Sequence, residues 1–122
     1  MRIDLTGRLA LVTGAAQGIG QAIALELKAA GATIVAADLD AEGVGAFAAA
    51  NGCEARVLDV SDRAAAHDLV EGIVAGHGRI DIVVNAAGGV RGQVGKPIAE
   101  VGERDWKVLF EANVDGAFWL AQ

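Results

Sequence analysis

Short apolar runs alternate with helix-forming segments along the chain, and this alternation limits the possible folds more than any other feature. The runs at 8–13, 33–37, 54–58 and 80–84 have the length of strands, and a helical pattern follows each one. Strands that are separated by helices usually pair in parallel through right-handed crossovers, with helices on both faces of the sheet. We therefore predict a single α/β domain over residues 1–122, in the order β-α-β-α-β-α-β-α.

The first helical segment begins directly after the run at 8–13. Ile19, Ile23 and Leu27 recur at every fourth position, so we expect this apolar stripe to face the sheet. Gly31 lies four positions after Leu27, and as a C′ glycine it predicts the end of the helix.

The other helices have start signals of their own. Asp40 can cap the second helix, and either Ser61 or Asp62 can cap the third. From Glu103 onward the apolar spacing predicts a long helix that runs to the last residue.

Composition argues against several classes of function. The formal net charge is −6, so the chain offers no basic surface that would bind the phosphates of a nucleic acid. His67 and His77 belong to no cluster of ligands, and we expect no metal site. The single Cys53 cannot form an internal disulfide, which fits a reducing compartment.

The sequence also gives no sign of contact with a membrane. Its start lacks the long apolar segment of a signal peptide. Charged residues interrupt the most apolar stretch before it reaches the roughly 18 residues that a membrane span needs. We expect a soluble, cytoplasmic protein.

The turn between the first strand and the first helix reads TGAAQGIG, at 13–20. Gly14 would allow a tight turn, Gly18 would let a ligand approach the backbone, and Gly20 would let the helix pack closely on the strand. Free N–H groups and the helix dipole at such a place favour a phosphate. The alternative is a glycine-rich turn that binds nothing.

Asp38 closes the second strand, 18 positions after Gly20, where a carboxylate can accept hydrogen bonds from the ribose of an adenosine. It would repel a 2′-phosphate, and neither Ala15, Ala16 nor Leu39 supplies a cation that would attract one. We therefore expect NAD(H) as the cofactor in preference to NADP(H). A helix cap or a solvated charge at the strand end is the alternative role of Asp38.

These features occur together with three further motifs. Asp59 and Val60 form a DV pair after the third strand, NAAG follows the fourth strand at 85–88, and Asn113 lies in the last helix. With the TGxxxGIG spacing of 13–20, the chain resembles the short-chain dehydrogenase/reductase family over essentially its whole length. The resemblance implies a Rossmann-like doubly wound sheet that binds a nicotinamide dinucleotide.

The resemblance also implies roles for individual residues. Asp59 would contact the adenine, the NAAG segment would lie beneath the nicotinamide ribose, and Asn113 would be catalytic by anchoring a water in the proton relay. Each has a structural alternative. Asp59 could cap a helix, NAAG could be a plain turn in which Asn85 bonds to backbone across the strands, and Asn113 could be a satisfied core amide that bends its helix. The expected cofactor contacts are Thr13, Gly14, Gln17, Gly18, Ile19, Gly20, Asp38, Leu39, Asp59, Val60, Asn85, Ala86, Ala87 and Gly88.

The chain departs from the family in one respect. The family uses a serine and a Tyr-x-x-x-Lys pair downstream of the asparagine, whereas this sequence contains no tyrosine, and its only serine is Ser61. We expect the chain to correspond to the N-terminal half of the family fold. The expected function is that of an NAD(H)-dependent oxidoreductase acting on an alcohol or carbonyl substrate, represented here by its cofactor-binding part. The alternative is a non-catalytic NAD-binding fragment or an interaction module.

Two further expectations concern surfaces. The sheet order should be 3-2-1-4, which leaves the strand at 80–84 as an edge. The last helix should expose the apolar residues Phe110, Val114, Phe118, Trp119 and Leu120, and so favour self-association.

In the loop at 88–96, Arg91 or Lys96 can meet an anionic group of a substrate or simply be solvated.

Overall fold

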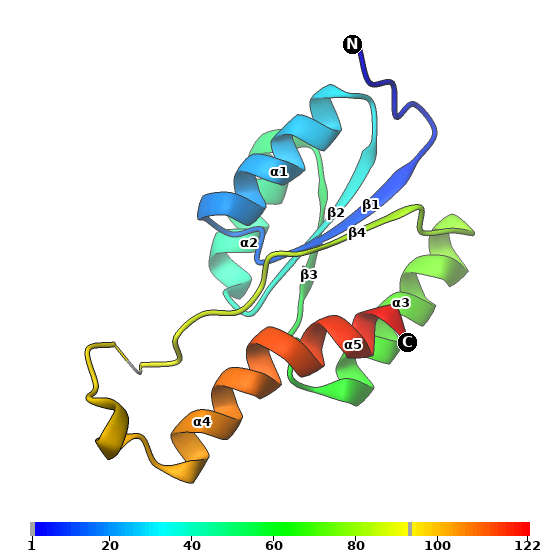
Figure 1. Ribbon diagram of the computed structural model, residues 1–122. Coiled ribbons are helices and arrows are strands. Elements are labelled where there is room, and N and C mark those ends of the chain that lie inside the picture. The colour runs from blue at the N-terminus through cyan, green and yellow to red at the C-terminus, as the bar shows by residue number, and fades with distance from the viewer. Residues whose placement is uncertain (1, 93) are drawn as a thin grey trace.

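The computed structural model describes residues 2–92 and 94–122, which form one parallel four-stranded sheet with helices on both faces (Figure 1). The strands are β1 (Leu9–Thr13), β2 (Thr33–Asp38), β3 (Glu54–Val57) and β4 (Ile82–Asn85). Their order, β3-β2-β1-β4, confirms the order expected from the sequence.

The register aligns the carboxyl ends of all four strands at one edge of the sheet. Thr13, the last residue of β1, lies opposite Ala37 of β2 and Asn85 of β4. On the other side of β2, Asp38 lies opposite Val57, the last residue of β3. The turns that leave these four strands therefore converge on one place.

Alternate residues of the central strands supply the two halves of the core. Leu9 and Leu11 belong to the cluster under α3 (Arg63–His77) and α5 (Gly116–Ala121). Ala10 and Val12 belong to the cluster under α1 (Gly18–Ala29) and α2 (Ala41–Asn51). Because β1 is buried on both faces, it reads as a continuous apolar run.

The helix α1 packs on the sheet mainly through small residues, and only part of the predicted stripe faces the core. Gly20 and Ala24 are its buried residues, whereas the side chain of Ile19 is 77% exposed and Ile23 and Leu27 are half-buried. The expectation that Ile19 faces the sheet was wrong, because the close approach that glycine and alanine allow leaves no room for it there. Leu27 does pack against the core cluster that contains Ala24, as expected.

The second and third helices begin with aspartate caps. The Asp40 side chain accepts a hydrogen bond from the Gly43 N–H at 3.0 Å, and Asp62 accepts one from the Ala65 N–H at 3.0 Å. Of the two candidates at the start of α3, Asp62 is therefore the cap, and Ser61 lies before it.

The last helical segment is continuous but not uniform. α4 (Glu103–Phe110) passes into a π-helical turn (Glu111–Asp115) and then into α5, and a short 3-10 helix (Ile98–Glu100) precedes them. Exposed apolar side chains on this segment are Trp106, Phe110, Val114 and Phe118.

Two residues expected on that exposed face lie elsewhere. Leu120 is buried in the core, and Trp119 is half-buried beside it, packed against the same cluster. This expectation was wrong for both, because α5 lies against α3 and turns this side of the helix inward (Figure 1). Within residues 2–92 and 94–122, no helix is both long and apolar enough to span a membrane.

A carboxylate fixes the opposite edge of the sheet, where β1 begins. Asp81 accepts the Leu9 N–H at 2.9 Å and forms ion pairs with Arg8, at 3.1 Å, and Arg79. The Leu9 N–H and, after it, the two guanidinium groups lower the pKa of Asp81 from 3.8 to about 2.

Candidate functional site

A cavity of about 640 Å³ opens at the carboxyl edge of the sheet, where the four strands end. Its walls come from the turn after β1, from the ends of β2 and β3, and from the segment after β4. It is lined by Gly14, Gln17, Gly18, Ile19, Gly20, Asp38, Leu39, Asp40, Leu58, Asp59, Val60, Ala86, Ala87, Gly88 and Arg91.

The cavity brings together all of the expected cofactor contacts except Thr13 and Asn85. It also includes three residues that were not expected there, Asp40, Leu58 and Arg91. Asp40 and Leu58 adjoin predicted site residues in the sequence, and that adjacency was a usable signal. Arg91 was named only as a loop charge that could meet a substrate, because its place in this cavity depends on the path of the loop.

The glycine turn has the backbone geometry that was expected of it. Gly14 has a φ of +68°, and a Cβ there would lie 2.7 Å from the backbone of Ala86 and Ala87. A Cβ on Gly20 would overlap the carbonyl oxygen of Gly14, so only glycine lets α1 start this close to the turn. Gly18 has a φ of +57° and no atom within 4 Å of its Cβ position, so its bare backbone faces open space.

The N-terminus of α1 differs from those of α2 and α3 in having no carboxylate cap. Its N-cap residue, Gln17, has an extended backbone and makes no side-chain hydrogen bond to the first turn. The first N–H groups of a helix have no intrahelical partner. Together with the positive end of the helix dipole, they suit an anion placed in the cavity.

Asp38 is held rigidly at the end of β2. One carboxylate oxygen, Oδ2, accepts the Ala16 N–H at 2.9 Å, and the other, Oδ1, accepts the Asp40 N–H at 3.0 Å. The side chain thus ties the glycine turn to the start of α2 while it lines the cavity. Neither bond uses all the acceptor sites of its oxygen, so both oxygens can still accept from a ligand.

Thr13 and Asn85 lie outside the cavity wall and hold the two central strands together. Thr13 is 1% exposed, and its hydroxyl donates to Asn85 Oδ1 at 3.1 Å. The same hydroxyl oxygen accepts the Ala87 N–H at 3.3 Å. Asn85 therefore joins β4 to β1, as its structural alternative proposed, although its partner is a side chain and not the backbone.

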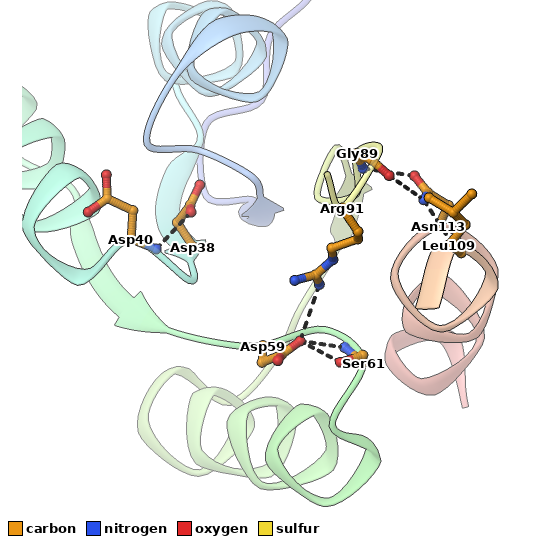
Figure 2. Close-up of polar contacts among 8 residues, drawn as sticks. All are labelled: Asp38, Asp40, Asp59, Ser61, Gly89, Arg91, Leu109 and Asn113. Atoms are coloured by element: carbon orange, nitrogen blue, oxygen red, sulfur yellow. Dashed lines mark hydrogen bonds and ion pairs between the residues drawn. The ribbon is translucent and has the colours of Figure 1, made fainter. Parts of the chain in front are cut away.

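At the end of β3, Asp59 is anchored by the residue two positions later. Its Oδ1 accepts from the Ser61 hydroxyl at 2.6 Å and from the Ser61 N–H at 3.0 Å (Figure 2). The Ser61 hydroxyl is the main reason that the pKa of Asp59 lies below its usual value, and Arg91 adds to the effect. Asp59 does not cap α3, because Asp62 does.

Asn113 binds the segment that follows β4. Its Oδ1 accepts the Gly89 N–H at 3.0 Å, and its Nδ2 donates to the Gly89 carbonyl at 2.9 Å and to the Leu109 carbonyl at 2.8 Å (Figure 2). Both amide hydrogens have acceptors and Oδ1 accepts one bond, but the residue is exposed, so the structural alternative of a core amide was wrong. Its partners are loop and helix backbone at the surface and not core groups.

The loop cations have ion-pair partners. Arg91 Nη2 lies 3.6 Å from Asp59 Oδ1, across the cavity, whereas Lys96 pairs with Asp105 of α4. Gln93, between them, lies outside the described residues.

The arrangement fits a nucleotide with a diphosphate. It offers uncapped amides at α1, a bare backbone at Gly18 where a Cβ would occupy open space, and an oriented carboxylate at Asp38 beside them. The amides suit the phosphates, and the carboxylate suits the hydroxyls of a sugar.

Comparison with known proteins gives the family. The family described as short chain dehydrogenase matches residues 8–122, and the chain therefore belongs to it. A short-chain dehydrogenase/reductase from Brucella melitensis, described as a glucose/ribitol dehydrogenase, has a crystal structure whose sequence is 37% identical to this chain. It superposes with a TM-score of 0.90 over 99% of this chain and 52% of its own.

Two curated relatives are similar over nearly the whole chain. D-threitol dehydrogenase of Mycolicibacterium smegmatis is 42% identical over 97% of this chain and 46% of its own length. The 3-oxoacyl-acyl-carrier-protein reductase FabG of Thermotoga maritima is 36% identical over 97% of this chain and 49% of its own. The chain spans about half the length of these relatives.

Proposed function

We propose that the chain provides the cofactor-binding part of an NAD(H)-dependent oxidoreductase. Hydride would pass between the nicotinamide and an alcohol or carbonyl substrate, which is chemistry that the cofactor supplies when it is bound. The observation that carries the proposal is the uncapped N-terminus of α1, which opens on a cavity that Asp38 also lines. The printed names of the relatives, a dehydrogenase and a reductase, support the same reaction class.

The N–H groups at the start of α1 would hold the diphosphate. Gly18 leaves room for close approach, since no atom lies within 4 Å of its Cβ position. Asp38 would accept the hydroxyls of the adenosine ribose, because its two oxygens are fixed by backbone N–H groups and keep further acceptor capacity. The 2′-phosphate of NADP(H) would be repelled by the carboxylates of Asp38 and Asp40, and this repulsion favours NAD(H).

The two nucleoside ends would extend in opposite directions along the edge of the sheet. The adenine would lie toward β3, where Asp59 and Val60 line the cavity, and the nicotinamide ribose toward β4, over Ala86–Gly88. Asn113 would hold the loop at Gly89, and thereby the floor of the nicotinamide end, in place. A water anchored by Asn113 for proton transfer is a further proposal for the same residue.

A second candidate is dinucleotide binding without catalysis. The observation that favours it is the absence of tyrosine from the 122 residues, since the family resemblance makes a tyrosine the proton donor. Ser61 does not replace the missing serine, because its hydroxyl donates to Asp59 at the β3 end of the cavity. For the polypeptide with this sequence, we favour binding without turnover.

Calorimetric titration with NAD and NADP tests the cofactor assignment. We expect NAD to bind more tightly, and we expect the pair of changes Gly18→Leu and Asp38→Ala to abolish that binding. Tighter binding of NADP, or an unchanged affinity in the doubly changed chain, contradicts the assignment. A dehydrogenase assay with several secondary alcohols separates the two candidates, because robust turnover would favour catalysis.

We also propose that the chain self-associates through the last helical segment. Trp106, Phe110, Val114 and Phe118 recur every fourth position and are each at least 43% exposed. Burial of such side chains is worth about 1.5–3 kcal/mol each, which favours association. Sedimentation at tens of micromolar tests this, and a well-behaved monomer would contradict it.

A further inference from the structure

Arg91 reaches across the candidate cofactor cavity. It lies in the loop after β4, which is one outer strand of the sheet. Its side chain extends to Asp59, which follows β3, the outer strand on the opposite side (Figure 2). Arg91 has a φ of +47°, which only a few per cent of non-glycine residues adopt. The loop geometry that aims this side chain thus has a cost in backbone strain.

The charges of the lining make this guanidinium distinctive. Asp38, Asp40 and Asp59 contribute carboxylates, and Arg91 is the only cationic residue among the described residues that line the cavity. Its side chain is 32% exposed and that of Asp59 is 41% exposed, so the pair itself adds little to stability.

The two oxygens of Asp59 are used differently. Oδ1 receives the Ser61 N–H, the Ser61 hydroxyl and the ion pair with Arg91. Within the described part of the chain, no hydrogen bond or ion pair involves Oδ2. The carboxylate can therefore hold Arg91 on one oxygen and accept a proton donor, such as an exocyclic amino group, on the other.

Distance argues against the diphosphate as the partner of Arg91. The phosphates are expected at the turn after β1, whereas Asp59 follows β3, two strand spacings away in the order β3-β2-β1. Two spacings amount to about 10 Å. The carboxylates of Asp38 and Asp59 mark this end of the cavity as a place for uncharged donors, namely a sugar and a base.

We propose that Arg91 covers the adenine ring of the bound dinucleotide, with its planar guanidinium held in place by Asp59. This inference rests on the proposed function, because it presumes that the adenosine lies at the β3 end of the cavity. A guanidinium stacks on aromatic faces by dispersion and by attraction to the π system, and anchoring to a carboxylate reduces the entropy lost on stacking. Arg91 is thus a ligand-binding residue that favours a nucleotide with a purine base.

The test is calorimetry of wild type, Arg91→Ala and Arg91→Lys with NAD, AMP, adenosine and nicotinamide mononucleotide. We expect Arg91→Ala to lower the affinities for NAD, AMP and adenosine alike, by about tenfold. The affinity for nicotinamide mononucleotide should not change. Arg91→Lys keeps the positive charge but lacks the planar guanidinium, so its affinities should stay close to those of Arg91→Ala. Arg104→Ala is the matched control, since Arg104 of α4 pairs with Glu111 of the π-helical turn and does not line the cavity.

Three results would overturn the inference while wild type still binds NAD. Unchanged affinity in Arg91→Ala removes any role in binding, and higher affinity shows that Arg91 obstructs the cavity. If the affinities for AMP and NAD fall while that for adenosine does not change, Arg91 contacts a phosphate and not the adenine. If wild type binds no NAD, the proposed function fails and this inference fails with it. Thermal unfolding of each variant shows whether a lost affinity reflects a damaged fold.

Discussion

The helices α1, α2 and α3 all begin at the carboxyl edge of the same sheet, but they begin in two different ways. At α2 and α3 an aspartate side chain accepts an N–H of the first turn, at 3.0 Å in both cases. At α1 the equivalent position is Gln17, whose side chain makes no such bond, and the turn before it is rich in glycine. The first turns of α2 and α3 are thus capped by their own chain, whereas the first turn of α1 keeps N–H groups that a ligand could use.

The largest effect is expected from filling the space that Gly20 leaves. In Gly20→Val the side chain would overlap the Gly14 carbonyl oxygen, and backbone cannot move aside cheaply. We expect the free energy of unfolding to fall by about 3 kcal/mol, and dinucleotide binding to be lost with the turn. Chemical denaturation measures the first quantity and calorimetry the second.

Gly45→Ala is the matched control for that change. Gly45 lies within α2, with no atom within 4 Å of its Cβ position, so alanine should raise stability by up to about 1 kcal/mol. Equal destabilisation by the two changes would show that the close packing at α1 is not the cause.

Giving α1 an aspartate cap like those of α2 and α3 would remove the difference between these helix ends. In Gln17→Asp the extended N-cap residue gains a carboxylate that can accept first-turn N–H groups, so stability should rise by about 1 kcal/mol. The same carboxylate would compete with the diphosphate, and we expect NAD affinity to fall by about tenfold or more. Gln17→Asn caps without charge and should lower the affinity less; an affinity that stays unchanged in Gln17→Asp would place the diphosphate elsewhere.

The reciprocal change removes a cap from a helix whose first turn does not line the cavity. Asp62→Ala loses the bond to the Ala65 N–H, and the free energy of unfolding should fall by about 1 kcal/mol. NAD affinity should not change, because Asp62 does not line the cavity. A drop in affinity, with the protein still folded, would mean that the capped and uncapped ends are not independent.

The smallest effect concerns the carboxylate at the opposite edge of the sheet, where Asp81 holds the Leu9 N–H. The folded pKa of about 2 lies below the ordinary value of 3.8, so the contribution of Asp81 to stability is complete above about pH 5. That contribution is lost as the pH falls from about 4 to 2. Denaturation of Asp81→Asn and wild type should therefore differ at pH 7 and converge near pH 2; a constant difference would contradict the assigned cause.

Much of the fold could be predicted from local patterns. Four short apolar runs separated by helices determined the sheet, and the glycine spacing located the turn with the uncapped helix. Local chemistry also identified Asp38 as a lining residue and Asp40 as a cap. These features depend on residues that are close in the sequence or on the general geometry of parallel sheets.

What could not be predicted depends on how close two elements approach or on the path of a loop. Ile19 was placed against the sheet by its periodicity, but the small side chains at Gly20 and Ala24 bring the helix too near for it. Arg91 was recognised as a charge in a loop, and its reach to Asp59 follows only from the folded backbone. A bend of the helix at Asn113 was one of the alternatives, but its form, a π turn, was not predicted.

That π turn allows the last helical segment to satisfy two requirements. Asn113 must point at Gly89, while seven residues later Leu120 must enter the core, where it is 5% exposed. Each α-helical residue advances the rotation by about 100°, so a π turn acts as one residue inserted into an otherwise regular helix. Deleting a single residue between Glu111 and Asp115 would therefore rotate α5 about its axis, and either the loop contact or the core contact would be lost.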